Sequence, residues 1–313
     1  MSHDAPVDAE RYLERIGFTR PILSNRETLD ELIRLHAANI PFENATSFGQ
    51  GPTPAGAIEL DSILVASKLL GGKRGGYCFE HAKLLQHVLP AYGFPTRCAL
   101  ARVYQDPRHA PSAKTHVVTV TRIGHREFLT DPGYGGLTPT ASLSLEELGK
   151  PQQTPHGRYR VVAAAAAGID LGHAPDIDVM VQVELAKGPD SQWVNLYAID
   201  LRGIANIDLP ALNWFVSTSP MSMFTQILAV SLAPEGKRIT LSNKTIRQRE
   251  GEEITERAIT STPDLALALD SLGIDLPDQL LSGVASRLQL DRASRDDCVQ
   301  EADTPDQFGD TFL

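Results

Sequence analysis

The chain has 313 residues, of which 42% are hydrophobic, and its formal net charge is −10. This length and apolar content suffice for one large packed unit or two smaller ones, and the acidic balance excludes general nucleic-acid binding, which requires a basic face. Half of the excess negative charge lies in residues 291–313, a segment with few apolar residues that we predict to be a mobile acidic tail.

The three cysteines, Cys78, Cys98 and Cys298, form no CxxC pair. Their spacing excludes a disulfide framework and a cysteine zinc site, and it indicates a reducing compartment. Residues 1–18 carry charges throughout, and the longest apolar run, 161–169, is too short to cross a bilayer. We therefore expect a cytoplasmic protein with no signal peptide, no membrane segment and no bound metal.

Helical spacing of apolar residues dominates the first ninety positions. It predicts helices over 10–16 and 27–38. Pro41 ends the second of these helices. Glu43 follows it and is a candidate partner for Arg74, although a solvated loop carboxylate is an equally good interpretation of the residue.

Residues 74–80, Arg-Gly-Gly-Tyr-Cys-Phe-Glu, place a cysteine between a Gly-Gly turn and an amphipathic run that stops at Pro90. The pattern predicts a helix that begins at or near Cys78. Unpaired N–H groups and the positive end of the helix dipole stabilise a thiolate at such a position. We interpret Cys78 as a nucleophile, and the alternative is a buried structural cysteine.

After the Cys78 helix, runs rich in Val, Thr, Leu and Phe predict three strands, over 97–104, 115–122 and 127–131. The loop at 123–126 is short enough to fix the pairing of the second and third strands. In that register His116 and Asp131 lie on one face as diagonal neighbours, close enough for an imidazole and a carboxylate to meet. A register change of one residue would separate them.

The remainder of the chain reads mainly as short strands and turns. The glycine-rich turn at 131–136 can present backbone N–H groups to an anion, although such a turn is more often only a loop. Alternating strands and turns over 159–201 predict a β-barrel or a strongly curved sheet. The individual elements expected from 159 onward are strands over 178–185, 192–201, 227–232, 238–242 and 244–248, and a final helix over 263–272.

A thiolate nucleophile needs a base that accepts its proton, and that base needs an orienting carboxylate. Cys78, His116 and Asp131 fit these three roles. The alternative bases are histidines on the same predicted helix or in a Pro-rich loop: His81, His87 and His109.

Taken together, these motifs resemble the arylamine N-acetyltransferase family. That family is marked by Arg-Gly-Gly-x-Cys, an upstream Pro-Phe-Glu-Asn, a strand-borne His and an Asp that begins a glycine-rich turn. All four occur here in the expected order, and 217–224 resembles the family as well; the similarity covers roughly 8–285. The resemblance implies an α+β fold with a cysteine-protease-like core, divided into a helical domain (1–90), a β-barrel domain (91–210) and an α/β lid (211–290).

The resemblance also implies roles for single residues. Cys78 would be acylated by acetyl-CoA, a cosubstrate and not a bound cofactor, while His116 would hold the thiol proton and Asp131 would orient His116. Arg74 and Glu43 would form an ion pair that fixes the nucleophile loop. The residues expected to wall the acceptor pocket are Phe42, Tyr134 and Phe224, and those expected to contact CoA are Thr115, Gly133 and Tyr134.

The function implied is transfer of an acetyl group from acetyl-CoA to an arylamine, arylhydrazine or hydrazide, with ping-pong kinetics. Three alternatives keep the same scaffold: an amide synthase that forms macrolactams from a carrier-bound acyl donor, a thiol hydrolase, and a non-catalytic binding protein. Ala82 departs from the family, which usually carries Asn there, and removes a possible hydrogen bond near the nucleophile. The sequence carries no signal for the oligomeric state.

Overall fold

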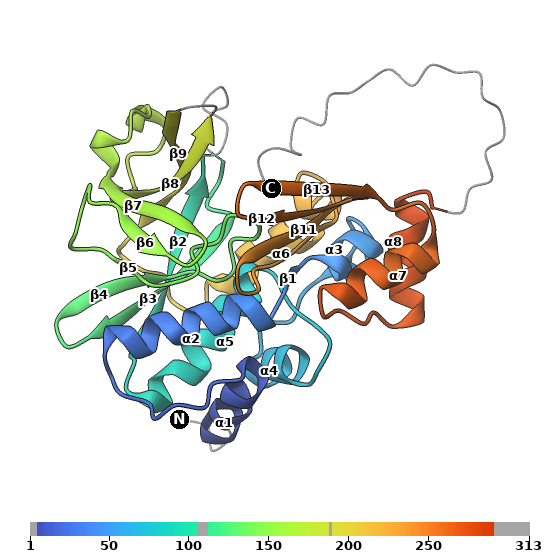
Figure 1. Ribbon diagram of the computed structural model, residues 1–313, viewed down its shortest axis with the longest axis horizontal. Helices are drawn as coiled ribbons and strands as arrows, with labels where there is room; N and C mark the ends of the chain where they lie inside the picture. The colour runs from blue at the N-terminus through green and yellow to red at the C-terminus, as the bar shows by residue number, and fades with distance from the viewer. Residues whose placement is uncertain (1–4, 105–111, 188–189, 291–313) are drawn as a thin grey trace.

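The structure is a computed structural model that describes residues 5–104, 112–187 and 190–290. It combines a group of N-terminal helices, an eight-stranded antiparallel sheet and a five-stranded antiparallel sheet with two C-terminal helices beside it (Figure 1). This is the α+β arrangement expected from the sequence. His109, Cys298 and the predicted tail at 291–313 lie outside the described residues.

Side chains cap the starts of two of the N-terminal helices, those that begin at Arg26 and Ser62, and all of the N-terminal helices except the one at 45–50 share a buried apolar core. Asn25 Oδ1 accepts a hydrogen bond from Thr28 N at 2.9 Å, and Asp61 Oδ1 accepts one from Ile63 N at 2.9 Å. The sequence pattern had indicated neither of the two short helices at 45–50 and 62–70. The helices are α1 (Ala5–Ile16), α2 (Arg26–Asn39), α3 (Ala45–Gln50), α4 (Ser62–Leu70) and α5 (Cys78–Val88).

The eight-stranded sheet carries the predicted hairpin in the predicted register. Ile123 pairs with Arg126 and Thr119 pairs with Thr130, so His116 and Asp131 lie just beyond the paired residues on the same side of the hairpin. A short 3₁₀ turn, Ala164–Ala166, follows the strand that ends at Ala163. The strands are β2 (Thr96–Val103), β3 (His116–Ile123), β4 (Arg126–Thr130), β5 (Leu143–Ser144), β6 (Gln152–Thr154), β7 (Gly157–Ala163), β8 (Val179–Lys187) and β9 (Asp190–Asp200).

This sheet nearly closes into a barrel. Its strand order, β5-β4-β3-β2-β9-β8-β7-β6, leaves β5 and β6 as the two edges. The Gln152 side chain of β6 bridges these edges, because its Oε1 accepts from Ser144 N at 2.7 Å and its Nε2 donates to Ser144 O at 3.0 Å. Side-chain hydrogen bonds therefore replace a backbone ladder at the closure, in agreement with the predicted barrel or strongly curved sheet.

The second sheet joins two distant parts of the chain, with strand order β1-β10-β11-β12-β13. Strand β1 comes from the N-terminal part, so this sheet crosses the boundary proposed at residue 90. Neither β13 nor α8 was predicted, and the predicted helix over 263–272 is α7. The elements are β1 (Phe42–Glu43), α6 (Leu209–Thr218), β10 (Ala229–Leu232), β11 (Lys237–Ser242), β12 (Thr245–Glu250), β13 (Glu253–Ala258), α7 (Thr262–Ser271) and α8 (Asp278–Arg287).

Strand β1 also touches the turn that precedes α5. Glu43 N donates to Gly76 O at 2.8 Å, and Gly76 N donates to Pro41 O at 3.2 Å. The second sheet is thus connected through β1 to the backbone just before Cys78. Among the described residues, no helix has the length and apolar character needed to span a bilayer.

Gly75→Ala tests this close approach. A Cβ at Gly75 would lie 1.9 Å from Pro41 O, and backbone on both sides of the contact cannot move aside cheaply. We expect the free energy of unfolding, measured by urea denaturation, to fall by about 3 kcal/mol.

The control for this experiment is Gly124→Asn in the β3–β4 turn. There φ is +61°, which Asn tolerates, and an added Cβ meets nothing within 4 Å. It should change stability by no more than about 0.5 kcal/mol. Equal effects of the two substitutions would show that the contact between Gly75 and Pro41 is not tight.

Candidate active site

Cys78 is the first residue of α5 and is 2% exposed. Glu80 caps the start of this helix with its side chain, because Tyr77 N donates to Glu80 Oε2 at 3.1 Å. Cys78 therefore lies at the end of α5 where the first-turn N–H groups are unpaired and the helix dipole is positive, as the sequence predicted.

His116 and Asp131 meet at the end of the hairpin. His116 Nε2 lies 2.8 Å from Asp131 Oδ2, and both side chains are buried. Asp131 Oδ1 accepts a second hydrogen bond, from Gly133 N at 3.2 Å. Since Nε2 is engaged by Asp131, Nδ1 is the ring nitrogen left for the hydrogen bond with the Cys78 side chain.

The electrostatics of this group favour a charged imidazole. Burial alone would lower the pKa of His116, but the charge and hydrogen bond of Asp131, together with those of Cys78, raise it to about 10. His116 is therefore a cation at neutral pH. A cation beside the sulfur stabilises negative charge on it.

Two tyrosines pack edge-on against His116. The ring of Tyr134 lies 5.2 Å from the imidazole, and the ring of Tyr197, which the sequence analysis did not single out, lies 4.9 Å from it. Tyr134 is buried and its hydroxyl donates to Leu196 O at 3.3 Å. The structure thus places the Tyr134 ring against the imidazole of His116. The contacts of Tyr134 with substrate and with CoA stay predictions.

A buried ion network holds the turn before Cys78. Glu43 Oε1 accepts from Arg74 Nε at 3.0 Å and Nη2 at 2.7 Å, while Glu43 Oε2 accepts from Ala45 N at 2.8 Å. Lys68 Nζ lies 2.8 Å from Glu80 Oε1 and 3.5 Å from Glu43 Oε1. The sequence suggested the Glu43–Arg74 contact, whereas Lys68 and Glu80 were missed as members of the network.

The network is balanced, with two carboxylates and two cations. Burial favours the neutral form of Glu43, but the adjacent Lys68 and Arg74 outweigh it and hold the pKa of Glu43 below its usual value. For Glu80 burial prevails, and its pKa is raised despite Lys68. Each carboxylate therefore depends on a cation that bridges from another element.

An aromatic cluster adjoins the nucleophile. The ring of Phe224 lies 5.9 Å from those of Phe42 and Tyr77, and this cluster shares a core with Cys78 and Ala82. The structure thus brings together Phe42 and Phe224, two of the three residues predicted to wall the acceptor pocket.

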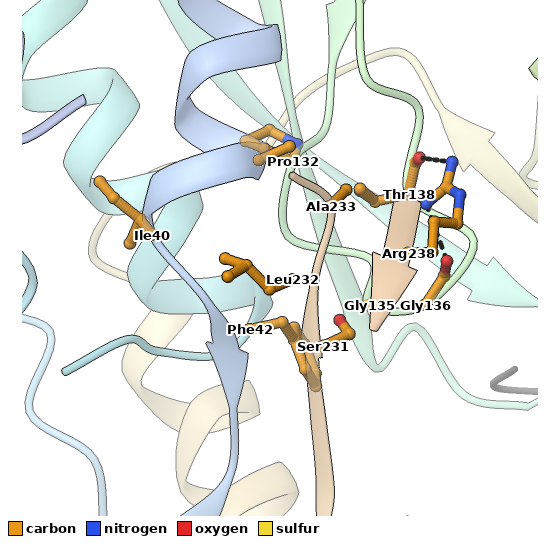
Figure 2. Close-up of a pocket in the computed structure, with 11 residues that line it drawn as sticks. Ile40, Phe42, Pro132, Gly135, Gly136, Thr138, Ser231, Leu232, Ala233 and Arg238 are labelled. Atoms are coloured by element: carbon orange, nitrogen blue, oxygen red, sulfur yellow. Dashed lines mark hydrogen bonds between the residues drawn. The ribbon is translucent and has the colours of Figure 1, made fainter. Parts of the chain in front are cut away.

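A narrow crevice beside Phe42 lies between strand β10 and the turn after Asp131 (Figure 2). Arg238 of β11 holds the turn by donating to Gly136 O at 2.8 Å and Thr138 O at 2.9 Å. The cavity volume is about 10 Å³, roughly the space of one water molecule. An aromatic ring can enter there only if the turn or β10 shifts.

The two remaining predicted CoA contacts flank the catalytic residues. Thr115 is half-buried next to His116, and its N donates to Ala113 O at 2.7 Å. A Cβ on Gly133 would lie 3.2 Å from Cys78 Cα, so the missing side chain lets the Asp131 turn lie against the start of α5.

The alternative histidines face other partners. His81 Nε2 lies 3.0 Å from Gly76 O, and His87 Nε2 lies 3.0 Å from Asp8 Oδ2 on α1. Neither arrangement directs a ring nitrogen to the sulfur. Among the described residues, only the triad thus shows the arrangement of base and acid that a nucleophilic cysteine requires.

Comparison with known proteins identifies the family. A family model described as N-acetyltransferase matches residues 25–280. The arylamine N-acetyltransferase of Mycolicibacterium smegmatis is 30% identical over 287 residues, which cover 90% of this chain and 97% of the relative. The chain belongs to the arylamine N-acetyltransferase family. The predicted family and enzyme class are thereby confirmed.

Two further relatives bear on the fold and the acyl donor. The structure of the Mycobacterium marinum arylamine N-acetyltransferase in complex with CoA has a TM-score of 0.77 and 27% identity, and the match covers 90% of this chain and 98% of that one. This match confirms the fold class of helices, barrel and α/β lid. An N-malonyltransferase of Fusarium pseudograminearum is 22% identical over 295 residues, covering 84% of this chain and 82% of the relative. The domain boundaries and the roles of single residues stay predictions.

Lys68→Met tests the ion network. The substitution keeps the chain length of the side chain but leaves Glu43 and Glu80 with Arg74 as the only cation of the network. We expect a loss of about 3 kcal/mol in the free energy of unfolding. Lys150→Met, which removes an exposed partner of Glu147, is the control and should cost no more than about 0.5 kcal/mol. A negligible effect of Lys68→Met would contradict the account of the network.

The raised pKa of His116 predicts a pH dependence of stability. Because the folded pKa of about 10 exceeds the usual 6.5, the stabilisation is complete below pH 6.5 and is lost as the pH rises through about 10. The difference in unfolding free energy between wild type and His116→Gln should shrink over that range. A difference that stays constant with pH would show that His116 is not held as a cation.

Proposed function

We propose that this enzyme transfers an acetyl group from acetyl-CoA to an aromatic amine or hydrazide through an S-acetyl intermediate on Cys78. The observation that carries the proposal is the 2.8 Å contact between His116 and Asp131 next to a cysteine at a helix start. Relatives named arylamine N-acetyltransferase, and one solved with CoA, support the choice of cosubstrates.

In the first half-reaction the Cys78 sulfur attacks the thioester carbonyl. The new S–C bond forms as the bond to the CoA sulfur breaks, and His116, which holds the thiol proton, gives it to the departing CoA thiolate. Asp131 keeps the imidazolium oriented and compensates its charge. The first-turn N–H groups of α5, including that of Cys78, are the proposed donors to the oxyanion.

In the second half-reaction an amine nitrogen attacks the S-acetyl carbonyl. His116 accepts the proton that the amine loses, and Cys78 leaves as the thiolate, which restores the starting pair. Product CoA departs before the amine reacts, so ping-pong kinetics follow.

The choice of a flat aromatic acceptor rests on Phe42, Phe224 and Tyr77. Aromatic rings bind one another by offset or edge-on contacts, and these three rings border the nucleophile. The crevice at Phe42 is water-sized, so we propose that the acceptor binds after a shift of the turn at 132–136 or of β10.

The intact mass of the protein after incubation with acyl-CoA tests the proposal. Wild type should gain one acetyl group, an arylamine should remove it, and Cys78→Ser should gain none. Cys98→Ala is the matched control, because Cys98 is also buried, with its thiol pKa raised to about 11 by burial, and it should leave the adduct intact.

The alternatives give different results in the same assay. An adduct with malonyl-CoA and none with acetyl-CoA would assign the chain to the chemistry named for the Fusarium relative. An adduct that decays equally fast without an amine would indicate a thiol hydrolase. Absence of any adduct with acetyl-CoA, propionyl-CoA and malonyl-CoA would contradict the proposed acyl donors and favour a carrier-bound donor or a binding protein.

A further inference from the structure

A chain of buried polar groups runs behind the nucleophile and takes no part in the chemistry above. The Tyr12 hydroxyl lies 3.2 Å from His36 Nδ1, and His36 Nε2 lies 2.7 Å from His81 Nδ1. His81 Nε2 then lies 3.0 Å from Gly76 O, two residues before Cys78. The three side chains are no more than 1% exposed.

The carbonyl at the end of the chain fixes the position of every proton in it. Gly76 O can only accept, so His81 Nε2 carries a proton and donates. If the His81 ring is neutral, Nδ1 must accept, which makes His36 Nε2 the donor. His36 Nδ1 then accepts from the Tyr12 hydroxyl. All hydrogen bonds therefore point from α1 toward the nucleophile turn.

The surroundings keep both imidazoles neutral. Burial lowers the pKa of His81 to about 4, although the hydrogen bond to Gly76 and the charge of Asp131 oppose it. Burial likewise holds the pKa of His36 well below its usual value, with His81 and Arg15 acting in the same direction. An additional proton on His81 Nδ1 would oppose the His36 Nε2 donor and break that link, whereas one on His36 Nδ1 would reverse the hydrogen bond with the Tyr12 hydroxyl.

His81 also separates the two turns of the active site. A Cβ on Gly133 would lie 2.9 Å from His81 Cβ and 3.2 Å from Cys78 Cα, so the Asp131 turn rests on both residues. On its other side, the His81 ring donates a hydrogen bond to Gly76 O, and Gly76 O also accepts one from Glu43 N at 2.8 Å. The ring therefore lies where it can set the distance between the nucleophile turn and the Asp131 turn.

We propose that Tyr12, His36 and His81 are positioning residues, which hold the Gly76 carbonyl and thereby the Cys78 sulfur in register with His116 and Asp131. The functional part of this inference rests on the proposed acylation of Cys78. Tyr12 of α1 lies outside residues 25–280, which the family model matches. A misplacement of about 1 Å at a reacting atom can cost roughly 100-fold in rate.

The direct test is NMR of protein labelled with ¹⁵N in its histidines. The account predicts a proton on His36 Nε2, with scalar coupling across the N–H···N bond to His81 Nδ1, and a proton on His81 Nε2. Tyr12→Phe should keep the coupling, because Gly76 O still fixes both tautomers, and should shift the His36 Nδ1 resonance by removing the hydrogen bond that this nitrogen accepts. Absence of the coupling in the wild type, or charged imidazoles at pH 7, would overturn the proposal.

The kinetic test compares variants in the rate of Cys78 acetylation. His81→Leu should lower the rate about 100-fold with little change in the KM for acetyl-CoA, and His81→Gln, which keeps a donor and an acceptor, should recover most of it. Tyr12→Phe should lower the rate in the same direction. Tyr104→Phe is the control, since Tyr104 is a buried tyrosine of another apolar cluster, and it should leave the rate unchanged.

A second readout separates this inference from the proposed function. Alkylation of Cys78 by iodoacetamide needs no acyl-CoA and should slow in the same variants by a similar factor. If the wild type accepts no acyl group, the proposed function fails while alkylation still tests the positioning. If folded Tyr12→Phe and His81→Leu are alkylated and acetylated as fast as the wild type, the positioning role is overturned.

Discussion

The proposed active site depends on one buried contact, the hydrogen bond between His116 Nε2 and Asp131 Oδ2. It has two functions at once, because it is the largest influence that raises the pKa of His116, which reaches about 10 with the help of Cys78, and it leaves Nδ1 for the hydrogen bond with Cys78. Without Asp131, a buried imidazole would lose its charge. The barrel supplies this pair from neighbouring strands, whereas the sulfur comes from α5. His116 can therefore reach the sulfur only if the barrel and α5 keep their relative positions.

Two groups of buried side chains hold the turn before Cys78 and so keep the sulfur in place relative to the His116–Asp131 pair. The ion network of Glu43, Lys68, Arg74 and Glu80 holds the turn before Cys78 from the side of β1 and α4. The neutral chain through His81 holds the same turn from the side of α1 and α2. The ion network has as many cations as carboxylates, and the chain through His81 is uncharged. Neither group therefore adds net charge next to the His116–Asp131 pair.

Local signals in the sequence predicted the parts of the site that depend on local geometry. The Gly-Gly turn and the apolar spacing placed the start of α5 at Cys78, and the short loop at 123–126 fixed the register that brings His116 to Asp131. Lys68, His36 and Tyr197 were missed, because their positions in helices and a strand read like ordinary amphipathic residues. Their partners come from elements distant in sequence, and β1 is too short to show a period.

The most direct test of the central contact is the rate of Cys78 acetylation by acetyl-CoA in Asp131→Asn compared with wild type. Asn keeps the shape of the side chain and one oxygen that can accept from His116, but it carries no charge and gives up the oxygen that accepts from Gly133 N, so it removes the stabilisation of the imidazolium. The account predicts a loss of about 10³-fold or more, as expected when the orienting acid of a nucleophile–base pair is neutralised. A loss of less than about tenfold in a folded variant would contradict it.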